Sequence, residues 1–308
     1  MPGRRARRTR LPDRHRHRQH PHRDGRRCRP LHRGRRGDQA EEAHPVNAIA
    51  TPGPAGAVDD IGYGRQFDGW YDRLFPKDES ATVTAERLAG LHPEPAAGTV
   101  EFGVGTGRIA VPLARRVGRI TGIDSSPEML AALRAALDDD TPVEPVHGDI
   151  RTHTAEHTAG LVYCVCGTLS MLLDPDDQQR AIHRAADLLA PGGRLVVETH
   201  NKAAILALHE GRTRTTYFTP YPEPGTGLQT HSVLLTEGSL WHCSHIWYES
   251  DGRTRVGTEL SRLTTPEEVD GYARAAGLRP ESRSADWHGT PYTEQSPMFV
   301  TTYVKAAV

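Results

Sequence analysis

The chain has 308 residues, of which 36% are apolar and 25% charged, a composition that suits a folded globular protein with a sizeable core. No stretch approaches the roughly 18 apolar residues of a membrane-spanning helix, and no apolar segment follows the N-terminal arginines as in a secretory signal. We therefore expect a cytoplasmic protein with no membrane partner. The four cysteines are too irregularly spaced for a disulfide framework and are expected to be reduced thiols.

The formal charge of −1 hides two segments of opposite sign. Residues 1–45 hold 15 arginines and five acidic residues, whereas the remainder carries 34 acidic and 23 basic side chains. We expect this leader to be disordered, because Arg, His, Pro and Gly offer little to bury. Since only three of the 38 basic residues are lysines, as in GC-rich coding, one interpretation is a start codon set too far upstream, with Val46 or Val58 as alternatives. The others are a solvated tail and a basic arm for nucleic acid or anionic membrane.

Within a predicted domain of residues 46–308, apolar strands alternate with amphipathic helices from about Ile61, a pattern typical of a mostly parallel sheet covered on both faces. The acidic body is a poor surface for a phosphate backbone, so we expect no nucleic-acid partner. The spacing predicts helices over 64–75, 80–91, 108–116, 127–137, 175–189 and 203–209, and strands over 98–102, 119–123, 142–146, 161–165, 195–199, 278–284 and 298–305.

Local signals mark several ends of these elements. Asp174 is suited to cap the helix that starts at Pro175, and the helix is expected to stop at the Pro-Gly-Gly turn of residues 191–193. Thr265 and Glu268 have the spacing of a capping box for a later helix.

The alternation of strands and helices breaks down over residues 210–264. Three β-rich runs, 228–235, 240–249 and 255–263, are separated by Glu-Gly and Asp-Gly dipeptides that favour hairpins. We predict an antiparallel insertion over residues 210–264.

The segment VEFGVGTGR at residues 100–108 is the most informative one. A strand that runs into Gly103, Gly105 and Gly107 and then into a helix lets the backbone approach a ligand closely. The usual dinucleotide fingerprint has its third glycine where this chain has Arg108, which disfavours NAD without excluding it.

Asp124 ends the next strand, in the sequence TGIDSSP. A carboxylate at this position is suited to accept hydrogen bonds from two ribose hydroxyls. The alternative is that Asp124 caps the helix that follows, although Ser125 or Ser126 can also cap.

Taken in order, the glycine loop, Asp124, the HGD sequence at residues 147–149 and the LLAPGGRL sequence at 188–195 resemble the class I S-adenosylmethionine-dependent methyltransferases, from Tyr63 to Lys305. Within that family the chain is most similar to bacterial small-molecule methyltransferases that tailor natural products, including antibiotics. The resemblance implies an α/β, Rossmann-like, seven-stranded, mostly parallel sandwich with a helical N-terminal lid and the antiparallel insertion. It departs from the family at Cys166-Gly167, where relatives more often carry Phe-Asn.

The resemblance also implies roles for individual residues. S-adenosylmethionine is the expected cofactor and S-adenosylhomocysteine its product, with Asp124 on the ribose, Ser125 and Met129 beside adenine, and Asp149 on the adenine amino group. The alternative for Asp149 is a turn or helix cap. The expected cofactor-binding residues are Tyr71, Glu101, Gly103, Gly105, Gly107, Asp124, Ser125, Met129, Asp149, Ile150 and Cys166.

His200 is the candidate general base, because it follows the fifth strand and ligand sites in open α/β sheets lie beyond the carboxyl ends of strands. A surface or capping histidine is the alternative. The lid aromatics Tyr63, Trp70 and Tyr71 either cover the pocket or simply pack as a stripe. No ligand set for a metal is fixed, so we expect none. The expected substrate-binding residues are Tyr63, His200, His231, Trp241 and His245.

The sequence thus predicts methyl transfer to nitrogen or oxygen of a small-molecule acceptor, with carbon as a further alternative, by a monomer or homodimer. An RNA or protein methyltransferase is favoured only by the basic leader. A nicotinamide-dependent oxidoreductase and a cofactor-binding protein without catalysis are the remaining alternatives.

Overall fold

The computed structural model describes residues 58, 61–67, 69–155 and 157–307. The chain divides into two units, Met1–Ile49 and Ala50–Val308, and only the second contains described residues. The predicted leader over 1–45, including its expected disorder, and the alternative start at Val46 therefore lie outside the described residues.

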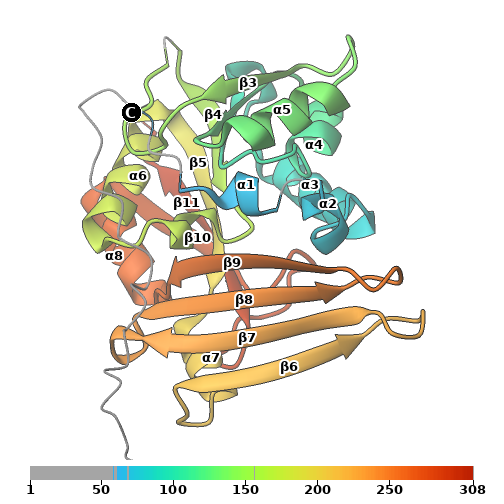
Figure 1. The fold of residues 1–308 in the computed structure, drawn as a ribbon. Helices are drawn as coiled ribbons and strands as arrows, with labels where there is room; N and C mark the ends of the chain where they lie inside the picture. Colours follow the sequence, from blue (N-terminus) through green and yellow to red (C-terminus); the bar gives the residue numbers. More distant parts are fainter. Residues whose placement is uncertain (1–57, 59–60, 68, 156, 308) are drawn as a thin grey trace, which may run out of the picture. The chain divides into compact units, whose positions relative to one another are not determined.

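Seven strands form one mostly parallel sheet in the order β10-β11-β5-β4-β1-β2-β3 (Figure 1). Strand β11 runs antiparallel to both β5 and β10, and the other pairs are parallel. The predicted seven-stranded, mostly parallel sheet is confirmed. Its strands are β1 (Thr99–Phe102), β2 (Ile120–Asp124), β3 (Val143–His147), β4 (Ala159–Cys164), β5 (Leu189–His200), β10 (Leu278–Ser284) and β11 (Met298–Lys305).

Helices cover both faces of this sheet and create two apolar cores. On one face α3 (Glu79–Leu91), α4 (Ala110–Val117) and α5 (Pro127–Ala136) contribute buried side chains, and on the other α6 (Pro175–Leu188) and α8 (Pro266–Ala275) do so. The remaining helical turns near the sheet are η1 (Pro95–Ala97) and η2 (Thr168–Met171). None of the helices in the described part of the chain is long and apolar enough to cross a membrane.

The predicted helix caps are confirmed. The Asp174 side chain accepts a hydrogen bond from the Asp176 backbone N–H at the start of α6. Thr265 and Glu268 form a reciprocal capping box on α8, in which each side chain binds the other's backbone N–H.

Residues 191–193 do not form the predicted turn after α6. They lie inside β5, which starts at Leu189, immediately after the helix. Leu189 pairs with Ala159 and Arg194 with Leu161, so four residues of β5 lie opposite one residue of β4. The Pro-Gly-Gly sequence, with Gly192 at φ +77°, therefore forms an irregularity within the strand.

The insertion is a second sheet of four antiparallel strands in the order β6-β7-β8-β9 (Figure 1). Three strands match the predicted β-rich runs, and β6 was not predicted, because its alternate residues are mostly exposed and polar. A short helix precedes them and η3 connects two of them. These elements are α7 (Lys202–Leu208), β6 (Arg214–Pro220), β7 (Gly227–Leu235), η3 (Thr236–Gly238), β8 (Leu240–Tyr248) and β9 (Thr254–Arg262).

The helix predicted over 64–75 is two short helices, α1 (Tyr63–Gln66) and α2 (Tyr71–Leu74). Gly69 at φ +74° lies between them, in a backbone conformation that no right-handed helix contains. We call residues 61–75, apart from the undescribed residue 68, the lid segment.

The lid segment is bound to the insertion. Phe67 and Trp70 are buried with Trp247 of β8 in a third apolar cluster, so packing is the structural role of Trp70. The Gln66 Oε1 accepts hydrogen bonds from the Thr258 backbone N–H at 2.9 Å and from its hydroxyl at 2.6 Å.

Candidate active site

The glycine loop joins β1 to α4, and its glycines have different roles. A Cβ on Gly103 would lie 2.4 Å from the Thr168 side chain, and one on Gly107 would lie 2.4 Å from Leu133 Cδ1, so both are required by packing. A Cβ on Gly105 would have no neighbour within 4 Å, although its φ of +54° still disfavours a side chain. The loop thus presents bare backbone to open space, which fits a ligand that approaches the chain closely.

Asp124 at the end of β2 is bound to this loop. Its Oδ2 accepts from the Gly105 N–H at 2.8 Å, and its Oδ1 accepts from the Ser126 N–H at 2.9 Å. The cap of α5 is Ser126, whose Oγ accepts from the Met129 N–H. Asp124 therefore does not cap the helix, and its carboxylate is oriented beside the loop as a ribose ligand requires.

Glu101 is the buried carboxyl beneath the loop, with 2% of its surface exposed. Its Oε2 accepts a hydrogen bond from the Tyr163 hydroxyl of β4 at 2.7 Å. Burial raises the pKa of Glu101 to about 8, although the Tyr163 bond acts in the opposite direction. The group is therefore mostly protonated at neutral pH, and a cation placed beside it would favour its ionised form.

Cys166 follows β4 and has a left-handed backbone, with φ +56°. Its N–H donates to Glu198 Oε2 at 2.8 Å, and its sulfur lies 2.9 Å from an Arg108 guanidinium nitrogen. Trp287 donates to the other oxygen of Glu198 at 2.7 Å. Solvent reaches the Cys166 side chain, yet desolvation by the surrounding atoms raises the pKa of its thiol to about 12, so the thiol is neutral.

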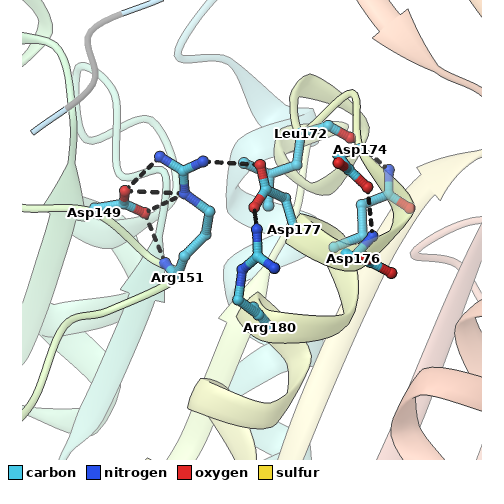
Figure 2. A network of polar contacts seen from close by, with 8 residues as sticks. Asp149, Arg151, Leu172, Asp174, Asp176, Asp177 and Arg180 are labelled. Carbon is cyan, nitrogen blue, oxygen red and sulfur yellow. Dashed lines mark hydrogen bonds and ion pairs between the residues drawn. The ribbon is translucent and has the colours of Figure 1, made fainter. Parts of the chain in front are cut away.

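Asp149 follows β3 and is held by Arg151, as Figure 2 shows. The Arg151 guanidinium binds both Asp149 oxygens at 2.6 to 3.0 Å, and its backbone N–H also donates to Oδ1. Burial opposes ionisation of Asp149, but these bonds outweigh it and lower the pKa of the carboxyl. Arg151 also binds Asp177 of α6 at 2.8 Å, and Asp177 binds Arg180. The Asp149 carboxylate is therefore already charge-compensated.

The other expected cofactor residues lie near the carboxyl ends of β1 to β4. Ser125 follows Asp124 directly, and its carbonyl lies 3.1 Å from His147 Nε2. Met129 and Ile150 are buried. Tyr71 begins α2, and burial raises the pKa of its hydroxyl. The Thr106 hydroxyl of the glycine loop donates to Asp72 at 2.6 Å, which joins the lid segment to the loop.

His200 ends β5, and its ring lies 4.9 Å from the Trp241 ring at an interplanar angle of 75°. Its Nδ1 is buried and has no hydrogen-bond partner among the described residues. Burial lowers the pKa of His200, although the charge of Glu259 acts in the opposite direction. The ring is therefore neutral at neutral pH, as a proton acceptor must be.

Trp241 and His245 lie on one face of the inserted sheet, together with Cys243 and Trp247, because they alternate along β8. We call this surface the inner face. It contacts the lid segment and His200 through the ring pairs Trp247–Trp70, His245–Phe67 and Trp241–His200.

His231 does not belong to the inner face, which corrects its grouping with Trp241 and His245. It pairs with Ser244, between Cys243 and His245 on β8, so its side chain is on the opposite face. There its ring contacts Thr216 and Gln229.

Glu259 of β9 is an inner-face residue that the sequence analysis missed. It pairs with Cys243 across the strands. Its Oε1 lies 3.4 Å from His245 Nε2, and burial and the Glu259 charge raise the pKa of the nearby Tyr63 hydroxyl. Glu259 lies two residues from Gly257 and from Ser261, on the buried side of β9, and this orientation depends on the pairing with β8 and has no signal in the sequence of β9 alone.

Comparisons with known proteins agree with this geometry. Residues 100–193 match a methyltransferase domain family. Over 119 residues the chain is 33% identical to the ubiquinone biosynthesis O-methyltransferase of Salmonella arizonae, a match that covers 38% of this chain and 47% of that protein. The chain thus spans about half the length of that relative. It is 29% identical over 208 residues to the trans-aconitate 2-methyltransferase of Escherichia coli, which covers 66% of this chain and 75% of that protein.

Solved structures extend the likeness beyond the parallel sheet. The CcbJ methyltransferase of Streptomyces caelestis superposes with a TM-score of 0.72 at 29% identity, covering 81% of this chain and 100% of that one. CalS10, an amino pentose methyltransferase of Micromonospora echinaspora, shares the fold with a TM-score of 0.58 at 22% identity, covering 75% and 95% of the two chains. With its glycine loop, its strand order and its matching methyltransferase domain, the chain belongs to the class I S-adenosylmethionine-dependent methyltransferases.

Proposed function

We propose that the protein transfers a methyl group from S-adenosylmethionine to a nitrogen or oxygen atom of a small metabolite. The observation that carries the proposal is the bond between the Gly105 N–H and the Asp124 carboxylate at 2.8 Å. It fixes an acidic side chain beside bare glycine backbone, and this pairing suits a ribose that is bound next to the loop.

The residues around the loop fit the rest of the cofactor. Glu101 and the backbone near Cys166 would face its methionine end, and Met129 and Ile150 would enclose adenine. Because Asp149 is already bound by Arg151, its share in adenine recognition would be a weaker, charge-compensated contact. When bound, S-adenosylmethionine supplies an electrophilic methyl group, which the acceptor displaces from sulfur while sulfur keeps the electron pair.

The chain's own contribution to the reaction is alignment and proton removal. Orientation of two reactants can lower a barrier by roughly 7 to 11 kcal/mol in favourable cases. The lid segment and the inner face of the insertion would exclude water and align the acceptor. His200, neutral and with an Nδ1 that has no hydrogen-bond partner among the residues that the structure describes, would accept the acceptor's proton.

A role in bacterial natural-product biosynthesis, including antibiotic tailoring, is part of the proposal. It is supported by the motifs of the chain and by the fold shared with CalS10, a methyltransferase of calicheamicin biosynthesis. We further propose that residues 46–308 act as one methyltransferase domain in the cytoplasm, with residues 210–264 covering the acceptor.

Calorimetric titration of the full chain with S-adenosylmethionine, S-adenosylhomocysteine and NAD tests the proposal. Saturable binding of the two sulfur compounds, and not of NAD, is the expected result. Failure of a folded sample to bind either sulfur compound would refute the cofactor assignment, and selective binding of NAD would favour an oxidoreductase.

A further inference from the structure

Glu259 is an enclosed carboxylate without a fixed cationic partner. Its side chain is 17% exposed, and its single ion pair within the described residues is with His245, at 3.4 Å. The Thr230 hydroxyl lies 3.2 Å from the other nitrogen of that ring. A neutral His245 can therefore serve both contacts, as donor to Glu259 and acceptor from Thr230.

Two other carboxylates of similar exposure are bound by arginine. Glu249, 15% exposed, binds Arg73 at 2.8 Å, and Asp270, also 15% exposed, binds Arg283 at 2.5 Å. Among the described residues, Glu259 has a histidine where these two carboxylates have an arginine. Because an enclosed carboxylate is destabilised unless a cation compensates it, the inner face is best completed by a ligand that brings a positive charge.

The surroundings of Glu259 suit an alkylammonium group. The Tyr63 ring is partly exposed and packs on the buried Phe67, with the ring centroids 4.6 Å apart. The face of an aromatic ring attracts an ammonium group within about 6 Å of its centroid. The same face also carries the Tyr217 hydroxyl, in the strand row of Thr230 and His245, which is buried without a partner among the described residues.

We propose that Glu259 binds the amino group of the acceptor, so that the methylated atom is nitrogen. This inference rests on the proposed function and names its acceptor class as an amine. His200 contacts the same inner face through Trp241, which pairs with Ser261, two residues from Glu259 on β9, and the Glu259 charge acts on the pKa of His200. Both residues therefore belong to the surface that would receive the amino group.

The order of events follows from charge balance. The bound ammonium first gives one proton to the neutral imidazole of His200, which frees the nitrogen lone pair. This lone pair forms the N–C bond as the C–S bond breaks, and the positive charge lost by sulfur appears on the methylated nitrogen. Glu259 stabilises the cation before and after the transfer, whereas a neutral alcohol could only donate a hydrogen bond to it and would lack the attraction between opposite charges.

The test compares a cation with its neutral counterpart on the full chain saturated with S-adenosylhomocysteine. Benzylammonium and benzyl alcohol are titrated by calorimetry into the wild type, Glu259→Gln and the control Glu223→Gln, which changes an exposed glutamate between β6 and β7. We expect the wild type and the control to bind the ammonium about tenfold more tightly than the alcohol, because bonds to charged groups exceed neutral ones. Glu259→Gln should lose this preference.

A second variant, Glu259→Asp, separates the role of the charge from that of the fold. It retains the charge and should retain a weaker cation preference. No cation preference in the wild type, a preference that survives Glu259→Gln, or any acceptor methylated on oxygen would overturn the inference. Absence of S-adenosylhomocysteine binding in the wild type would instead overturn the proposed function.

Discussion

The carboxyl edge of the parallel sheet and the inner face of the inserted sheet hold their carboxylates in different ways. At the edge, Asp124 accepts from two backbone N–H groups, and Glu198 accepts from one backbone N–H and from the Trp287 side chain. On the inner face, Glu259 of β9 is in contact with the side chain of His245 of β8, 3.4 Å away. The first arrangement follows from the path of the main chain, and the second depends on the identity of each side chain.

Substitutions of side chains are therefore expected to have different effects at the carboxyl edge and on the inner face. Backbone donors persist when side chains change, so the cofactor edge is sensitive mainly to the conformation of its loop. Side-chain donors disappear with a single substitution, so the inner face can change its ligand without any change in fold. The same scaffold can thus keep one cofactor while its acceptor varies.

The largest effect is expected at His200, beside the inner face that would receive the acceptor. His200→Gln should lower kcat by about 10² to 10⁴-fold if His200 removes the proton, and leave S-adenosylhomocysteine affinity unchanged. Because burial lowers the pKa of His200, the wild-type rate should hold below pH 6.5 and fall only as the ring protonates at lower pH. Steady-state rates across pH provide the measurement.

The matched control is His242→Gln on the opposite face of β8, which pairs with Leu260 and should leave the rate unaltered. A loss of only a few fold in His200→Gln, with the fold intact, would count against proton transfer to this residue and leave alignment as its role.

The next largest effect is expected in the glycine loop, where the cofactor would bind. Gly105→Ala places a methyl group in the open space of the loop at φ +54°, where a left-handed backbone alone costs roughly 1 to 2 kcal/mol. Affinity for S-adenosylmethionine should fall by about 100-fold, which calorimetry can measure. In the control Gly271→Ala, within α8 and with nothing within 4 Å, affinity should stay constant. Undiminished binding by Gly105→Ala would show that the cofactor does not approach this backbone.

The smallest effect concerns Glu101, whose pKa is raised to about 8 by burial. The folded protein binds this proton more tightly than the unfolded chain does. The contribution of protonated Glu101 to the free energy of unfolding is therefore fully present below about pH 4.5 and is lost as the pH rises through 8. Glu101→Gln should therefore melt above the wild type at pH 9 by a few degrees, relative to the difference at pH 5, without cofactor.

The exposed Glu94→Gln is the control for this comparison, and its melting temperature should differ from the wild type equally at both pH values. A Glu101→Gln variant with the same pH dependence as the wild type would mean that Glu101 is ionised in the folded protein.

Prediction from sequence succeeded where the signals are local. The glycine loop, Asp124 and the caps at Asp174 and Thr265 each depend on residues within a few positions, and the structure has them as loop, strand end and caps. The seven-stranded, mostly parallel sheet follows from the resemblance to the family, which the ordered motifs carry.

Prediction from sequence failed where the position of a strand or side chain depends on which distant strand pairs with it. Strand β6 has little apolar alternation of its own and forms because β7 lies beside it. Glu259 faces the lid only because Cys243 is its partner, and His231 faces away for the same reason, since a shift of one residue reverses every side chain. Such registers are set by the whole sheet and cannot be inferred from a single strand.

The contact between Gln66 and Thr258 has a consequence for solubility. Strand β9 is an edge of the inserted sheet, and an unpaired edge can recruit a strand from another molecule. The Gln66 side chain occupies one of its backbone donors, and α1 lies against the strand. A chain shortened past the lid segment would therefore be expected to self-associate through β9, and the lid protects the protein from its own copies as well as enclosing its ligands.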